Sequence, residues 1–131
     1  MILQKNEENT LPEVIFEEIK RTLSIKGKSI SLAVVEHFDP FFPYFKKEID
    51  RDEDLKIIID LEYFNTKASR ILLDIFKIAK KVEKNGRELS IDWYYEEEDD
   101  SMLEAGEDYA EILKIPFNFI IGRYFIIKYF F

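Results

Sequence analysis

The sequence predicts a mixed α/β fold, a single-domain sandwich in which a mixed β-sheet packs with helices. Along the chain, segments whose apolar residues alternate as in strands are followed by segments whose apolar residues have the spacing of a helix. Two of the strand-like segments come first, on either side of a short turn. With 131 residues, 47% of them hydrophobic, the chain suffices for one core. We therefore expect the order ββαβαβαβ within one domain that spans residues 1–131.

The first third of the chain supplies two strands and an interrupted helix. Residues 14–18 and 21–26 have strand patterns, and Gly27-Lys28 is a turn signal. A helix is expected over residues 32–38. It breaks at Asp39-Pro40, where Asp39 can cap and Pro40 can occupy the first position of a second helical piece. Aromatic residues crowd this region and are expected in the core: Phe38, Phe41, Phe42, Tyr44 and Phe45.

The centre of the chain predicts a strand over residues 55–64 followed by a long helix. The strand's apolar positions alternate and should share its buried face: Leu55, Ile57, Ile59, Leu61 and Tyr63. The helix has one apolar stripe: Ala68, Ile71, Leu72, Ile75, Ile78, Ala79 and Val82. Its lysines point elsewhere: Lys77, Lys80, Lys81 and Lys84. Gly86 is expected to end the helix in a left-handed conformation.

The last third predicts a strand, a helix and a final strand. Leu89, Ile91, Trp93 and Tyr95 alternate with polar or less apolar neighbours. Ser101-Met102-Leu103-Glu104 matches a capping box, which would open a helix. The inner stripe of that helix is expected to hold Ala105, Tyr109, Ile112 and Leu113. Pro116 should end it before a strand that begins with Phe117, Phe119 and Ile121.

The corner between the central strand and its helix is the first place to look for function. Asn65 and Thr66 are both good capping residues. Lys67 and Arg70 then place cations in the first turn, at the end of the helix dipole that favours anions. A bound or covalent anion would remove this conflict. The plain alternative is that Thr66 only caps the helix and that both cations are solvated surface residues.

Composition excludes several function classes. The formal net charge of −8 and the pI near 4.8 argue against nucleic acid as a partner. The absence of cysteine rules out disulfides, thiol nucleophiles and thiolate metal sites. The start of the sequence lacks the apolar stretch of a secretory signal, so we expect a cytoplasmic protein. The apolar C-terminus is too short, and too interrupted by Arg123 and Lys128, to span a membrane.

Several motifs, taken in order, resemble one family. They are Leu61-Glu62-Tyr63-Phe64-Asn65-Thr66, Ile71-Leu72-Leu73-Asp74, Trp93-Tyr94-Tyr95 and Met102-Leu103-Glu104-Ala105-Gly106-Glu107-Asp108. Together they look like the SiaC-family regulatory phosphoproteins. The expected element order also resembles the STAS-like fold of anti-sigma-factor antagonists, in which a phosphorylated hydroxyl starts a helix after a central strand. The resemblance reaches about Ile121 and leaves residues 122–131 as a C-terminal extension.

The resemblance implies a partner switch that has no catalytic residues and no cofactor. Thr66 falls on the threonine that the family phosphorylates, with Asn65, Lys67 and Arg70 around it. The implied partners are a protein kinase with a histidine-kinase-like ATPase fold, a PP2C-type phosphatase, and an effector. In the family's characterised pathway the effector is a diguanylate cyclase that the unphosphorylated form activates. Expected partner contacts are Glu62, Tyr63, Phe64, Tyr94, Glu97 and Asp99.

This chain departs from the family just after the threonine. Where the family often continues Asn-Thr-Ser-Ser, the sequence has Asn65-Thr66-Lys67-Ala68-Ser69. The threonine is intact. The change falls on residues that a kinase or a partner would contact, so the identity of both stays open.

Two other readings of function compete with the switch. The run Glu96-Glu97-Glu98-Asp99-Asp100, with Asp92, could bind Mg²⁺ or Ca²⁺ in a metal-dependent hydrolase, with His37 or a water as the base. Consecutive side chains diverge, however, and a solvated loop is the plainer interpretation. A purely structural oligomer is the other reading. The aromatic and β-branched residues from 122 to 131 suit either an edge strand or an arm that pairs with another copy.

Overall fold

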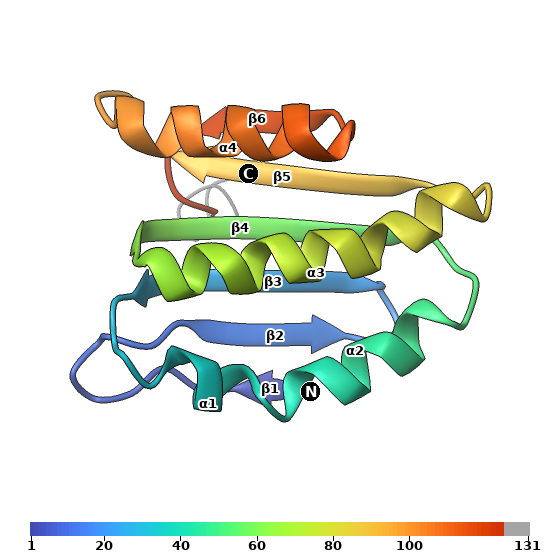
Figure 1. Cartoon of the computed structure of the whole chain (residues 1–131), viewed down its shortest axis with the longest axis horizontal. Helices are drawn as coiled ribbons and strands as arrows, with labels where there is room; N and C mark the ends of the chain where they lie inside the picture. The colour runs from blue at the N-terminus through green and yellow to red at the C-terminus, as the bar shows by residue number, and fades with distance from the viewer. Residues whose placement is uncertain (125–131) are drawn as a thin grey trace.

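The computed structural model describes residues 1–124. Within them, six strands form one sheet in the order of the sequence (Figure 1). The strands are β1 (Ile2–Leu3), β2 (Glu13–Glu17), β3 (Thr22–Ser29), β4 (Leu55–Phe64), β5 (Leu89–Tyr95) and β6 (Phe117–Ile121). The helices are α1 (Val34–Phe38), α2 (Phe41–Ile49), α3 (Thr66–Lys84) and α4 (Asp100–Leu113).

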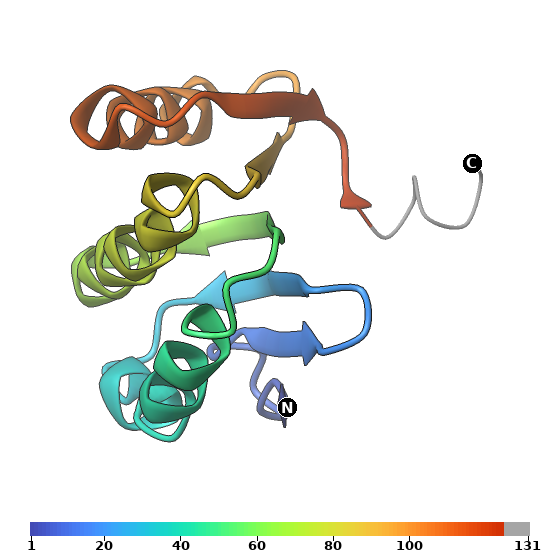
Figure 2. The same ribbon diagram turned by 90° about the vertical axis from the view of Figure 1, so that its right-hand side faces the viewer.

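The sheet is mixed, as expected from the sequence. β1, β2 and β3 pair antiparallel, whereas β3 to β6 are parallel. Each parallel step needs a crossover, and the helical segments supply it. These helices all lie on one face of the sheet (Figure 2), which gives two layers. The predicted α/β class and element order are confirmed; β1 is an additional short strand that the sequence did not signal.

The core fills the space between the sheet and the helices. Trp93 is its largest fully buried side chain, and its indole N–H donates to the carbonyl oxygen of Met102 at 2.9 Å. The aromatic cluster of α1 and α2 is part of this core: the rings of Phe41 and Phe45 stack with centroids 4.9 Å apart. Phe76 of α3 is also fully buried, although it was absent from the predicted stripe.

A bulge near the end of β4 reverses the predicted alternation. Gly27 pairs with Leu61, but the next residue, Lys28, pairs with Tyr63, so Glu62 is an extra residue on β4. An extra residue shifts every later side chain to the other face. Tyr63 is therefore 58% exposed, and the prediction that it shares the buried face is wrong. Phe64 turns inward instead, with its ring 6.1 Å from that of Trp93.

The helix ends match the expectation only in part. Asn65 caps α3, and Thr66 is the first helical residue rather than the cap. Asp99 caps α4 through an oxygen that accepts from the amide of Met102 at 3.0 Å, so the predicted capping box at Ser101 is wrong. Gly86 adopts the left-handed conformation predicted for it, with φ of 80°. Ile112 was expected inside but is 66% exposed, because Met102, Gly106, Tyr109 and Leu113 form the buried stripe of α4.

The far face of the sheet, marked by Asp60, Ile58 and Tyr94, is turned away from the four described helices. After β6 the chain bends at Gly122, whose φ of 116° favours glycine, and comes to lie on this face. Arg123 then bonds to Asp60 at 2.8 Å, and the Tyr124 amide donates to the same carboxylate at 2.9 Å. The rings of Tyr124 and Tyr94 are 5.7 Å apart.

The C-terminal arm predicted from the sequence lies outside the described residues from position 125 onward. Among the described residues, no helix has both the length and the apolar character needed to cross a membrane.

Candidate functional site

The carboxyl ends of β4 and β5 lie at the same edge of the sheet because the two strands are parallel neighbours. Thr66 follows β4 there, and the acidic loop of residues 96–99 follows β5. Figure 1 shows the start of α3 and this loop at the same end of the molecule. The fold thus brings the predicted phosphorylation site and the acidic run to one edge. We call the region around the start of α3 the Thr66 corner.

The geometry of Asn65 explains why α3 starts where it does. Its extended backbone, with φ of −84° and ψ of 178°, lets its side-chain oxygen accept from the Ala68 amide at 2.9 Å. The backbone amide of Asn65 donates to the carbonyl oxygen of Ser29 at 2.8 Å, and its side-chain amide donates to that of Ser31 at 3.2 Å. The helix start is therefore tied to the end of β3 as well as to β4.

Thr66 is exposed on the first turn of α3. Helix geometry leaves the amides of Thr66 and Lys67 without a carbonyl partner inside the helix. Both amides carry the positive end of the helix dipole, which is the arrangement that binds phosphate groups elsewhere. A phosphate on the Thr66 hydroxyl would find donors already in place, without any rearrangement of the fold.

The two predicted cations lie on the solvent side of this turn. Lys67 is exposed, and Arg70 is 79% exposed with its Nε 3.9 Å from a carboxylate oxygen of Asp74. A loose, exposed pair of this kind contributes little to stability. Arg70 is therefore free to turn towards a phosphate on the preceding turn at small cost.

Exposed apolar side chains surround the Thr66 corner, and sequence reasoning missed most of them. Leu32 is 76% exposed, Val35 44% and Ile30 39%, and all three belong to the segment that holds Asn65 through Ser31. Tyr63 adds an exposed ring from β4. The sequence signal was an apolar run at residues 30–35 that fits neither a strand alternation nor a full helical stripe. Grouped exposed apolar residues of this kind mark interaction surfaces.

The other predicted partner contacts divide between two places. Glu62 and Glu97 are exposed, and Phe64 is half-buried at the same edge of the sheet. Asp99 is occupied as the cap of α4. Tyr94 does not join the corner: it lies on the far face and is only 4% exposed. Burial there raises the pKa of its phenol, and the nearby charge of Asp92 adds to the rise.

The acidic loop does not gather into a metal site. The Glu96 carboxylate accepts a hydrogen bond from the Nε of Arg123 at 2.8 Å. Glu98 is exposed to solvent. Within residues 1–124, no group of three or more histidine, cysteine or carboxylate side chains is placed to hold a metal ion. His37, the alternative catalytic base, has its Nε2 2.7 Å from the carbonyl oxygen of Pro12, so it ties α1 to the N-terminal segment.

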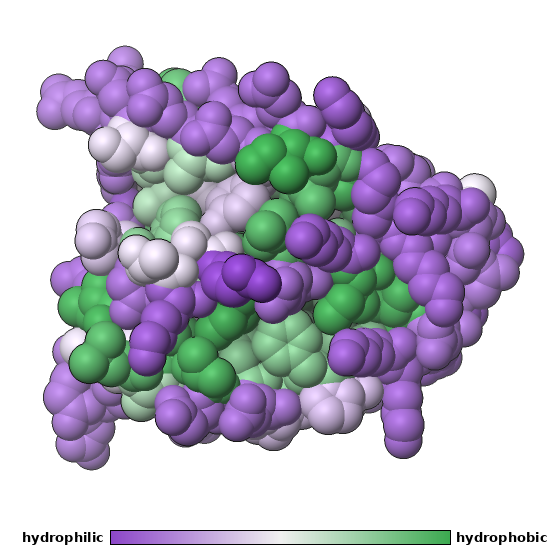
Figure 3. Space-filling model, in the orientation of Figure 1, coloured by the Kyte–Doolittle hydropathy of each residue, from purple (hydrophilic) through white to green (hydrophobic). Residues whose placement is uncertain are grey.

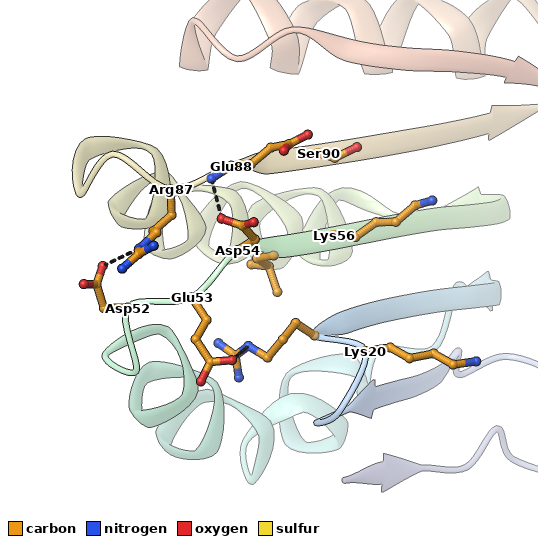
Figure 4. Close-up of a pocket in the computed structure, with 10 residues that line it drawn as sticks. Lys20, Asp52, Glu53, Asp54, Lys56, Arg87, Glu88 and Ser90 are labelled. Atoms are coloured by element: carbon orange, nitrogen blue, oxygen red, sulfur yellow. Dashed lines mark hydrogen bonds and ion pairs between the residues drawn. The ribbon is translucent and has the colours of Figure 1, made fainter.

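A charged hollow lies at the opposite end of the sheet from Thr66. It measures about 670 Å³ and is lined by charged side chains near the amino ends of β4 and β5 (Figure 4). These charges pair with one another or with neighbours: Arg87 with Asp52 at 3.5 Å, and Arg21 with Glu48 at 3.2 Å. The side chain of Asp54 accepts from the Glu88 amide. The charged residues around this hollow therefore have a structural role, in which they pair with one another and with their neighbours.

Comparison with solved structures shows the same fold. Apo-SiaC from Pseudomonas aeruginosa superposes with a TM-score of 0.80 at 21% identity, over 92% of this chain and 98% of that one. A crystal structure of the diguanylate cyclase SiaD in complex with its activator SiaC, from the same organism, gives 0.84 at 20% identity, over 93% and 99%. An uncharacterized protein of P. aeruginosa strain UCBPP-PA14 is 25% identical over 96 residues, or 72% of this chain and 76% of that relative.

The family model described as SiaC family regulatory phosphoprotein matches residues 5–121. This range includes the Thr66 corner and the acidic loop, and it ends at the last residue of β6. The chain belongs to the SiaC family of regulatory phosphoproteins.

Proposed function

We propose that this chain is a non-enzymatic adaptor whose binding to an effector is switched by reversible phosphorylation of Thr66. The observation that carries the proposal is the position of Thr66: an exposed hydroxyl on the first turn of a capped helix, beside unpaired amides and exposed apolar residues. Family membership supports a regulatory role, and SiaC of P. aeruginosa is the activator of a diguanylate cyclase. By this likeness, the effector is a diguanylate cyclase that the unphosphorylated form activates.

The switch follows from the charge of the phosphate. Phosphorylation adds about −1.5 to −2 charges at neutral pH. The helix amides, Lys67 and Arg70 stabilise that charge while it is in water, so the folded state survives. An effector that covers the corner with an apolar surface must remove water from the phosphate. This desolvation costs several kcal/mol unless arginine residues of the effector replace the lost water contacts. Phosphorylation therefore weakens binding without unfolding the protein.

The contact surface of the effector would be the exposed apolar residues at the corner, above all Leu32, Val35 and Tyr63. Glu62 and Glu97 supply charged contacts at its border. A cognate kinase of the histidine-kinase-like ATPase type and a PP2C-type phosphatase would add and remove the phosphate, acting in the cytoplasm.

The competing metal-dependent hydrolase has no support in the described residues. Asp92, which it needs as a ligand, is 7% exposed, lies 3.3 Å from the Lys56 ammonium and accepts from Asn118 at 2.9 Å. These two contacts occupy its carboxylate on the far face of the sheet.

The test treats the protein with its cognate kinase, locates the phosphate by mass spectrometry, and measures capture of the effector by each form. Thr66→Ala is expected to resist phosphorylation and to bind the effector whether or not kinase is present. Ser69→Ala is the matched control on the same turn, because the Ser69 hydroxyl already donates to the carbonyl oxygen of Thr66 at 2.6 Å. This control should behave like the unaltered chain.

Two results would overturn the proposal. One is phosphate found on Ser69 or Ser101 alone. The other is equal capture of the effector by the phosphorylated and unphosphorylated chains. Thr66→Glu and Thr66→Asp are less informative, because a carboxylate carries less charge than phosphate and has a different shape.

A further inference from the structure

A second candidate surface lies between α2 and α3, on the helical side of the molecule. Two adjoining hollows of about 390 and 360 Å³ share Lys46, Lys77 and Ile78. We call them together the α2/α3 groove. Its walls are Phe42, Lys46 and Ile49 from α2 and Lys77, Ile78 and Lys81 from α3. Ile78 is 12 residues along α3 from Thr66, or about 18 Å at 1.5 Å per residue, so the groove is separate from the corner.

The floor of the groove is apolar and partly open. Phe42 and Ile78 are both half-buried, one from each helix, and the buried Ile49 lines the second hollow together with Ile78. Figure 3, which views this side of the molecule, shows hydrophobic surface exposed along the boundary of α2 and α3 between hydrophilic side chains. Apolar floors between two helices are where amphipathic helices bind.

The rim of the groove has an unbalanced positive charge. Three lysines, Lys46, Lys77 and Lys81, line it against two aspartates, Asp50 and Asp74. Asp50 pairs with Lys81 at 2.5 Å, and Asp74 lies 3.9 Å from Arg70 in a loose pair. Among residues 1–124, Lys46 and Lys77 take part in no ion pair, although the chain as a whole has a net charge of −8. Two free cations thus stand on opposite walls of one apolar groove.

We propose that the α2/α3 groove binds an acidic amphipathic helix of a partner protein. Apolar side chains spaced three and four residues apart would cover Phe42 and Ile78, and flanking carboxylates would meet Lys46 and Lys77. The charge of the rim is what selects an acidic partner, because the rest of this acidic protein repels one. The proposal does not depend on Thr66 and concerns a second contact, distinct from the phosphorylation switch.

The test uses a designed helical peptide of about four turns, with leucines at three- and four-residue spacing and glutamates elsewhere. A matched peptide carries lysine at every glutamate position. Amide NMR spectra of the full chain are recorded during titration with each peptide. We expect the acidic peptide to shift the amides of Phe42, Lys46, Lys77 and Ile78, with binding weakened by added salt, and the basic peptide to leave them unchanged.

Charge reversal at the rim distinguishes binding in the groove from a general electrostatic attraction to the protein. Lys46→Glu with Lys77→Glu should weaken binding of the acidic peptide roughly tenfold, and both sites are exposed enough to leave the fold intact. Lys47→Glu with Lys84→Glu is the matched control, since it makes the same charge change on the same two helices outside the groove. The control pair should keep most of the binding.

Several outcomes would overturn the proposal. The acidic peptide could leave the groove amides unchanged, or both peptides could bind alike. Equal weakening by the two charge-reversal pairs would show a general charge effect in place of a binding groove. Groove shifts that appear with anionic phospholipid vesicles but not with the peptide would identify a lipid surface. Shifts that grow with protein concentration alone would identify a second copy of this chain.

Discussion

At the scale of single residues, Asn65 caps α3, and Thr66 is the first residue of the helix and the proposed phosphorylation site. The sequence alone offered both residues as caps. Both are good caps by type, and only the extended backbone of Asn65 shows which one satisfies the helix. Thr66 is consequently left free for chemistry. A residue that both capped the helix and carried a phosphate would link phosphorylation to unfolding. Because Asn65 is the cap, we do not expect this link for the proposed phosphorylation of Thr66.

This division predicts unequal effects of two neighbouring substitutions. Asn65→Ala should lower the free energy of unfolding by about 1 kcal/mol, because it removes the cap and the bond to Ser31. Thr66→Ala should change it by less than about 0.5 kcal/mol, as at other exposed surface sites. Urea denaturation of the two variants is the measurement. A larger loss of stability for Thr66→Ala than for Asn65→Ala would show that Asn65 is not the cap.

Another residue whose role the sequence left unexplained is Gly106 in α4. A Cβ built at this position would lie 2.8 Å from atoms of Trp93 and of Phe119. No real side chain tolerates that distance, so glycine here lets α4 approach the sheet and bury Trp93. The glycine in the motif of residues 102–108 therefore has a packing explanation, independent of any binding role.

At the scale of elements, α3 connects the proposed phosphorylation site, Thr66, to the core. Its buried stripe holds the helix against the sheet and so fixes the direction in which Thr66 and Arg70 point. Leu72, at 2% exposure, lies in the middle of this stripe.

Leu72→Ala should therefore reduce the free energy of unfolding by about 2–5 kcal/mol, the usual cost of a cavity in a packed core. Chemical denaturation measures it. Lys84→Ala, on the exposed side of the same helix, is the control and should change little. A midpoint that stays unchanged in Leu72→Ala would mean that the wrong side of α3 has been placed inward.

A tyrosine links α4 to the first turns of α3. The Tyr109 hydroxyl donates to the carbonyl oxygen of Ser69 at 2.8 Å, and burial raises the pKa of this phenol to about 12. The unfolded value is about 10. Between about pH 10 and about 12 the unfolded chain therefore loses a proton that the folded chain keeps. The contribution of Tyr109 to stability is complete below about pH 10 and falls as the pH rises to about 12.

Tyr109→Phe should show this effect as a smaller loss of stability with rising pH. The measurement is the free energy of unfolding at intervals from about pH 9 to about pH 12. Some slope should persist, because the pKa values of Tyr44 and Tyr94 are raised as well. Parallel curves for the variant and the unaltered chain would exclude Tyr109 as a contributor.

The elements also show how far sequence patterns reach. The period of apolar residues identified the long strands and helices, because burial on one side leaves a regular trace. It failed at Tyr63, where a bulge shifts the alternation, and at Ile112, where the buried stripe of α4 runs through Gly106 instead. Both depend on pairing with distant parts of the chain, which no local pattern records. Thr66 came from the family resemblance, whereas Leu32 and Val35 needed the fold.

At the scale of the whole molecule, the sheet separates two sides that differ in structure (Figure 2). The helical layer carries the α2/α3 groove, while the far face receives the chain after β6. Arg123 is 17% exposed there and Asp60 only 5%, and the two side chains are 2.8 Å apart. Arg123 lies just beyond the family match, which ends at residue 121, whereas Asp60 lies within it.

Asp60→Asn should be costly because it leaves the Arg123 guanidinium half-paired on a buried face. We expect a loss of about 3 kcal/mol, with a smaller loss when Arg123→Met is present as well. A double-mutant cycle by urea denaturation gives the coupling energy of the pair. Additive losses in the two single variants would show that the ion pair contributes nothing of its own.

The central claim is that phosphate at Thr66 acts on binding and leaves the fold unchanged. The most direct measurement compares the phosphorylated and unphosphorylated full-length chains in two assays at once: the dissociation constant for the effector by calorimetry, and the midpoint of thermal unfolding. We predict a dissociation constant at least about tenfold higher for the phosphorylated chain, equal to a loss of 1.4 kcal/mol or more, with nearly equal midpoints. Equal affinities, or a loss of affinity that accompanies a collapse of the unfolding midpoint, would contradict the account.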